Sequence, residues 1–388
     1  MSKGLGTPFL LLLLIAAPVS PQARLDRLSD AEFWALVSDA SEPGGVFHAD
    51  NFTSNEPSFA NTVATLAKSG PHGGAYLGVG PEQNFHYIAA IRPAIAVIFD
   101  IRRQAVMQHL LFKALFELSA DRVEFIARLF SLPVPGRVDR MGSIDAIWQR
   151  FGEAPGTDRT RLAANIAEVE SRLTRTHGMA LSDEDLKSLA YVYEAFFRLG
   201  PAINYAGDQK NLTTLNTNFM KLTSAADDAG VPRSFLGTDE QYQFLKSLQS
   251  RNLVVPIQAD FGGPKALRAV GDFLHARALT VSAFYISNVE QYLFNPRMPA
   301  ATGGQEINGG WQAFYENLAA LPADDTTIVL RVPISPATAG LTVRRTLPDG
   351  TVRTERRDAT PPCGLKELLA AYRAGKIRTQ GDANFCGR

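Results

Sequence analysis

The sequence predicts an α/β protein built on a mainly parallel sheet of about seven strands, with a helical insertion between the second and third strands. The first observation is a strand–turn–helix–strand pattern that fills residues 73–104. The second is a continuous apolar run over residues 94–99, rich in β-branched residues and typical of a strand buried on both faces. The third is that helical patterns separate five strand signals, which implies parallel strands with helices on both faces of the sheet.

The N-terminus has the pattern of an export signal. Lys3 precedes an apolar run over residues 9–17, and small residues and prolines follow it. Such a run is too short to span a bilayer as a stable helix, but it fits the core of a signal peptide. We therefore expect a mature N-terminus between Ala17 and Leu25 and a periplasmic or secreted chain without a membrane span. The alternative is a buried N-terminal helix.

The strand–turn–helix–strand pattern has the size of a βαβ unit. A strand is expected over residues 75–79, followed by a turn around Gly78 and Gly80. Pro81 stands at the first helical position, where its missing N–H has no intrahelical partner to lose. The second strand then ends at Asp100.

Helix signals dominate the next part of the chain. After helices near residues 104–118 and 119–130, residues 139–250 carry no strand signal, and we expect a helical insertion there. A capping box at Ser29 with Glu32 predicts a helix start before the sheet, and the segment from Ser182 to Asp185 is expected to cap a helix inside the insertion.

Strand signals return after the insertion and complete the sheet. Further strands are expected over residues 253–259, 279–286 and 326–332, and a β-hairpin over 341–346 and 351–354 should add one antiparallel strand. The predicted organisation is a signal peptide (1–23), an N-terminal helix, loop and first half of the sheet domain (24–138), the insertion (139–250), the second half (251–358) and a C-terminal tail (359–388).

Composition excludes some classes of protein. Among 388 residues, 39 basic side chains balance 39 acidic ones, so the basic field of a nucleic-acid binder is missing. In an exported chain the two cysteines, Cys363 and Cys386, suggest one disulfide that pins the tail, although two unpaired buried thiols are the alternative. Two cysteines and six scattered histidines show no metal-binding spacing, and no metal is expected.

A ligand site is expected beyond the carboxyl ends of the strands, where open α/β sheets bind ligands. Gly78 and Gly80 let the backbone approach a ligand, and the helix after them presents free N–H groups. Asp100 follows at about the spacing, roughly 20 residues, at which such folds place an acid that accepts hydrogen bonds from ribose hydroxyls. Asp260 closes the third strand and Asn288 closes the fourth.

This arrangement resembles the class I S-adenosylmethionine-dependent methyltransferase fold, a Rossmann sheet. More narrowly, "YLGVGPEQNF", "FDIRRQ" and "ADRVEFIARLFS" are similar to a little-characterised family of bacterial exported or lipoprotein-type proteins with such a core. The resemblance implies a fold and no established reaction. It names S-adenosylmethionine as the candidate cofactor and assigns these positions: Gly78, Gly80, Glu82 and Asp100 for the cofactor, Asp260 for its base, and Asn288 or Tyr292 for the methyl acceptor.

Two departures from the methyltransferase pattern matter. Tyr76 stands where these enzymes carry an acid for the methionine part, and Glu82 replaces a small residue. A carboxylate at Glu82 would repel the pyrophosphate of a dinucleotide, which S-adenosylmethionine lacks. We therefore expect a non-catalytic or degenerate small-molecule-binding protein, with an S-adenosylmethionine-dependent methyltransferase of unknown acceptor as the alternative.

Each candidate also has a purely structural interpretation. Asp100 could pair with Arg102 or Arg103, Asp260 could cap the following helix, and Asn288 could be a turn residue. Glu56 is expected to be a structural loop residue.

Overall fold

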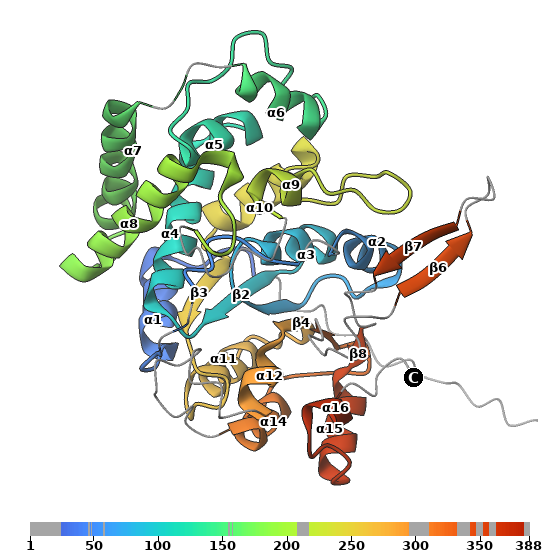
Figure 1. Ribbon diagram of the computed structural model, residues 1–388. Coiled ribbons are helices and arrows are strands. Elements are labelled where there is room, and N and C mark those ends of the chain that lie inside the picture. Colours follow the sequence, from blue (N-terminus) through green and yellow to red (C-terminus); the bar gives the residue numbers. More distant parts are fainter. Residues whose placement is uncertain are drawn as a thin grey trace, which may run out of the picture.

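A six-stranded sheet in the order β3-β2-β1-β4-β5-β8 forms the centre of the computed structural model (Figure 1). The structure describes residues 25–45, 47, 49–56, 59–153, 156, 158–207, 217–294, 310–331, 342–346, 352–356 and 362–383. The strands of this sheet are β1 (Ala75–Val79), β2 (Ile95–Asp100), β3 (Val254–Gln258), β4 (Val281–Ser287), β5 (Ile328–Arg331) and β8 (Cys363–Gly364). All neighbours pair in parallel except β5 and β8, which are antiparallel.

The parallel strands therefore match the five that the sequence predicts, but the antiparallel edge does not come from the predicted hairpin. Among the strands that the structure describes, β6 (Thr342–Thr346) and β7 (Val352–Arg356) pair with each other alone, in a sheet of their own. The two-residue strand β8 takes the edge position instead. A strand of two residues has no alternation for a sequence pattern to reveal, which explains the error.

Side-chain burial explains why these segments form strands. Every residue of β2 is buried, as the continuous apolar run predicts. Pro256 lies within β3, opposite Ile98, and has no N–H to offer a neighbour. It is tolerated because β3 is the edge strand on that side of the sheet.

Helices cover both faces of the sheet. In Figure 1 the helices between β2 and β3 lie above the sheet, and α11, α12, α14 and α15 lie below it. The predicted capping box at Ser29 is present, and the predicted helix cap at Ser182 is also a capping box. The described helices are α1 (Asp30–Ala40), α2 (Phe59–Ser69), α3 (Gln83–Ile91), α4 (Arg103–Leu118), α5 (Arg122–Leu129), α6 (Ile144–Gly152), α7 (Arg159–Ser171), α8 (Asp183–Leu199), α9 (Phe219–Thr223), α10 (Asp239–Ser250), α11 (Ala266–His275), α12 (Val289–Phe294), α14 (Gly310–Ala319), α15 (Leu365–Arg373) and α16 (Gln380–Ala383), with short π- and 3₁₀-helical turns at Arg172–Thr176 and Gly200–Ala202.

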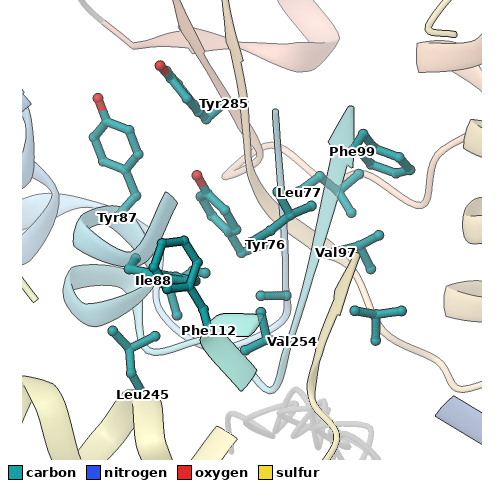
Figure 2. Packing of buried hydrophobic residues seen from close by; sticks show 14 of the residues in the cluster. Tyr76, Leu77, Tyr87, Ile88, Val97, Phe99, Phe112, Leu245, Val254 and Tyr285 are labelled. Carbon is teal, nitrogen blue, oxygen red and sulfur yellow. The ribbon is translucent and has the colours of Figure 1, made fainter. Parts of the chain in front are cut away.

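The core joins the sheet to the helices above it. Figure 2 shows strand side chains packed against residues of α3, α4 and α10, and it places the hydroxyl groups of three buried tyrosines, Tyr76, Tyr87 and Tyr285, on the same side of the cluster. Among the helices that the structure describes, none is long and apolar enough to cross a membrane. The predicted signal peptide and Cys386 lie outside the described residues.

Candidate functional site

The order of the sheet reverses between β1 and β4, and this switch point is where open α/β sheets bind ligands. A segment that we call the strap, the described residues of 41–56, crosses the carboxyl ends of the strands at this place. The strap contacts the ends of β3, β2, β1 and β4 in that order along the chain. Near β3 and β2, Glu42 N–H donates to the Gln258 carbonyl (3.1 Å) and Gly45 N–H donates to the Ile101 carbonyl (2.9 Å). Near β1 and β4, Ser54 N–H donates to the Glu82 carboxyl (3.1 Å) and Glu56 accepts a hydrogen bond from Ser287 (2.5 Å). The strap thus covers the expected ligand site.

Gly78 makes room for the protein's own side chains. A Cβ added at Gly78 would lie 1.9 Å from Asn84 Oδ1 and 2.8 Å from the Tyr76 ring. Asn84 ties the turn from inside, because its Nδ2 donates to the carbonyls of Val79, Gly80 and Pro81 at 3.0, 3.1 and 2.7 Å. The buried Tyr76 hydroxyl donates to Asn84 Oδ1 at 2.9 Å. Tyr76, which replaces the expected acid, therefore braces the turn.

Gly80 is open on the side facing the strap. Its φ of +82° lies in the region that favours glycine. A Cβ placed there would meet Asn51 Nδ2 at 3.8 Å, and no other atom of the described residues would lie within 4 Å. Its carbonyl accepts a hydrogen bond from the buried His109 ring at 2.9 Å, and burial lowers the pKa of that imidazole to about 4.

Glu82 is fully buried at the start of α3. Its Oε1 accepts the Ser54 N–H, but within the described residues its Oε2 has no hydrogen-bond partner. Burial raises the pKa of this carboxyl to about 8. Glu82 is therefore mainly protonated at pH 7, and it does not present the negative charge that its position suggested.

Asp100 lies at the end of β2 and is committed to Arg102. Arg102 Nε and Nη2 each donate to the Asp100 carboxylate at 3.0 Å, and the Arg102 backbone N–H adds a third bond at 2.9 Å. Both side chains are more than nine-tenths buried. Arg102 Nη1 also donates to the strap carbonyls of Ala49 and Asp50, so the ion pair joins β2 to the strap. Arg103, the other suggested partner, pairs with Asp185 of α8 instead.

Asp260 and Tyr292 make different contacts in the structure. Asp260 Oδ1 accepts the Gly262 N–H in a tight turn, while Glu42 of the strap accepts from the Asp260 and Lys265 N–H groups before α11. Tyr292 lies on α12, and its ring meets Phe47 of the strap at 5.6 Å.

The Arg102 guanidinium lies 5.7 Å from the centre of the same Phe47 ring, so Phe47 connects Tyr292 to the Asp100–Arg102 pair. Asn288 precedes α12. Its Oδ1 lies 3.3 Å from Ser287 Oγ, and its Nδ2 lies 3.5 Å from Gln291 Oε1.

A polar cluster that sequence reasoning missed lies at the switch point. The buried Glu56 carboxyl accepts hydrogen bonds from Ser287 Oγ (2.5 Å), Tyr285 Oη (2.6 Å) and Gln83 Nε2 (2.6 Å). Burial raises the pKa of this carboxyl, although the three donors act in the opposite direction. A hydroxyl inside the apolar strand 281–287, at Tyr285, and a serine at its end were the available signals. The position of Glu56 in a loop gave no signal of a site.

Among the residues that the structure describes, no group of three or more His, Cys, Asp or Glu side chains could hold a metal ion. The model of one protein family, described as a domain of unknown function (DUF7790), matches residues 51–342 of the chain. The search of curated proteins found no match to the chain.

Proposed function

The chain belongs to the DUF7790 family, a domain of unknown function, and we propose that it is an exported, methyltransferase-like protein that binds a small molecule without transferring a methyl group. In this proposal the S-adenosylmethionine site is degenerate, because residues that would hold the cofactor are bound by other residues of the chain. The observation that carries the proposal is the buried, bidentate ion pair between Asp100 and Arg102 beneath the strap.

The methyltransferase-like fold is supported by the strand order and by the antiparallel edge. A dinucleotide-binding Rossmann sheet runs in the order 3-2-1-4-5-6 with its strands parallel. This sheet has the same order for its first five strands, but its sixth strand is antiparallel, and the sequence also predicts one antiparallel strand beside five parallel ones.

Three features support loss of the cofactor. Both oxygens of Asp100 already accept hydrogen bonds from Arg102, so ribose hydroxyls would have to displace a buried guanidinium. Tyr76 offers no charge to the ammonium group of the ligand, and its hydroxyl is used by Asn84. The space that Gly78 leaves is filled by Asn84.

The surroundings of Gly80 and Phe47 support a smaller ligand. Within the described residues Gly80 is open toward Asn51, and the rings of Phe47 and Tyr292 contact each other. Ligand sites combine apolar surface with a few placed polar groups, and these residues are of both kinds.

Native mass spectrometry of the protein purified from its own host tests the proposal. We expect either the mass of the unliganded chain or an adduct other than S-adenosylmethionine. An S-adenosylmethionine adduct that survives purification would support the alternative function, a methyltransferase of unknown acceptor, and would contradict the proposal.

Export is supported by the apolar run over residues 9–17, which follows Lys3 and fits the core of a signal peptide. Intact mass of the secreted or periplasmic protein should place its N-terminus between Ala17 and Leu25, and a full-length cytosolic species would contradict export.

A further inference from the structure

We infer that the Glu56 cluster is a catalytic site for acyl transfer, in which Ser287 is the nucleophile and Glu56 is its general base, with a neutral carboxylic ester as the substrate class. This inference goes beyond the proposed cofactor-free binding function and does not depend on it. It rests on the position, the backbone and the hydrogen bonds of Ser287.

The position is the one at which this fold places ligands. Ser287 ends β4, and Gly80 follows β1 directly, so the two residues flank the point where the strand order reverses. Ser287 is half-buried, whereas Glu56 behind it is buried. The hydroxyl is therefore the more accessible partner of the two.

The backbone at Ser287 is unusual. Its φ is +50°, in the left-handed region that non-glycine residues seldom adopt. The pairing of β4 with β5 also shifts here, since Tyr285 and Ser287 face the consecutive residues Leu330 and Arg331. Bulges of this kind re-aim side chains near active sites, and backbone strain gathers at such sites. A serine on a strained strand-to-helix turn, just before α12, is how α/β hydrolases present their nucleophile.

The hydrogen bonds give each side chain a role. A nucleophilic hydroxyl needs a base within reach, and the base needs a third group to orient it. Ser287 Oγ donates to Glu56 Oε1 at 2.5 Å, while Tyr285 Oη and Gln83 Nε2 hold Oε2 at 2.6 Å each. Gln83 Oε1 is fixed in turn by the Ser54 hydroxyl. Burial raises the pKa of the Glu56 carboxyl, which moves it toward the range in which a carboxylate is an effective base.

The reaction balances with water as the only co-reactant. Ser287 Oγ bonds to the ester carbonyl carbon as its proton passes to Glu56 Oε1. The ester C–O bond then breaks, and the leaving alcohol takes that proton. Water attacks the acyl group on Ser287, again passing a proton through Glu56, and releases a carboxylic acid and free Ser287. The Glu56 carboxylate would repel an anionic phosphoryl group, so a neutral ester is the favoured substrate class.

An active-site-directed fluorophosphonate and the hydrolysis of p-nitrophenyl acetate test the inference. We expect a covalent adduct on Ser287 by peptide mapping. Ser287→Ala should abolish both the adduct and the hydrolysis, and Glu56→Gln should slow hydrolysis by about 10²–10⁴-fold, the usual contribution of a general base. Ser282→Ala is the matched control, because Ser282 is a buried serine of the same strand whose hydroxyl donates to the Gly73 carbonyl instead. It should retain full labelling.

The alternative role for the cluster is to anchor the strap without chemistry. Folded wild-type protein that gives no adduct on Ser287, or labelling that Glu56→Gln leaves unchanged, would overturn the inference. If Glu56→Gln does not fold, Tyr285→Phe replaces it, since this change removes one donor to Glu56. The acid limb of the pH–rate profile should then move to higher pH, and an unmoved limb would count against Glu56 as the base.

Discussion

The Asp100 carboxylate and the Arg102 guanidinium form two parallel hydrogen bonds of 3.0 Å, and both groups are almost fully buried under the strap. This pair occupies the position at which a nucleoside-binding sheet would meet the ribose of its ligand. Asp100, the acid that suggests a cofactor site in the sequence, therefore helps to hold the strap against β2.

Removal of Arg102 should destabilise the protein strongly. Arg102→Ala leaves the Asp100 charge buried without its cationic partner, which costs roughly 3–5 kcal/mol in the free energy of unfolding. Arg92→Ala is the control, because the Arg92–Glu240 pair is exposed and such pairs contribute at most about 1 kcal/mol. Urea denaturation measures both changes. Equal losses of unfolding free energy in the two variants would show that the Asp100–Arg102 pair does not hold the strap against β2.

The neutral state of Glu82 predicts how stability changes with pH. The folded-state pKa is raised to about 8 from an ordinary value of 4.5, so the folded protein holds a proton that the unfolded chain releases between these values. The contribution of Glu82 to stability is fully present below pH 4.5 and declines as the pH rises through 8, by at most about 1.4 kcal/mol per pH unit.

Glu82→Gln should remove this decline, because an amide does not titrate. Chemical denaturation at pH 5, 6, 7 and 8 should therefore show the stability of the variant rising relative to the wild type. Glu184→Gln, at an exposed position near the start of α8, should follow the wild type throughout. Parallel profiles for Glu82→Gln and the wild type would mean that Glu82 is ionised in the folded state.

Much of the sheet was predictable because burial and turns leave local signals. The apolar run of β2, the Gly–Pro start of α3 and the serine caps of α1 and α8 each follow from a few adjacent residues. The two-residue strand β8 has no such pattern. Its pairing with β5 depends on contacts across the fold, so the sequence suggested the hairpin as the sheet edge instead.

The site was less predictable because its partners come from distant parts of the chain. Spacing placed Asp100 at the end of β2, but it could not distinguish a ribose contact from the bond to Arg102. Glu56 and Ser287 are 231 positions apart in the chain and meet only because the strap crosses the strand ends. The sequence of the strap is that of an ordinary polar loop, because its conformation depends on its contacts with the distant residues that it covers.

The predicted disulfide between Cys363 and Cys386 stays a prediction, because Cys386 lies outside the described residues. Cys363 is buried in β8, the short strand that completes the sheet edge. A bridge that closes the loop between Cys363 and Cys386 would stabilise the protein by roughly 3 kcal/mol on the loop-entropy model. Peptide mapping of the exported protein without reductant should recover the linked peptides, and two alkylated thiols would refute the bridge.

Isothermal titration of the mature protein with S-adenosylmethionine tests the central claim most directly. Loss of a charge-assisted partner for the ammonium group costs about 1.5–3 kcal/mol, roughly tenfold to a hundredfold in affinity, and the ribose must also compete with Arg102 for Asp100. The account predicts no saturable binding at micromolar ligand concentrations. A dissociation constant in the micromolar range or tighter, lost on Asp100→Ala, would contradict it and make S-adenosylmethionine the ligand of this site.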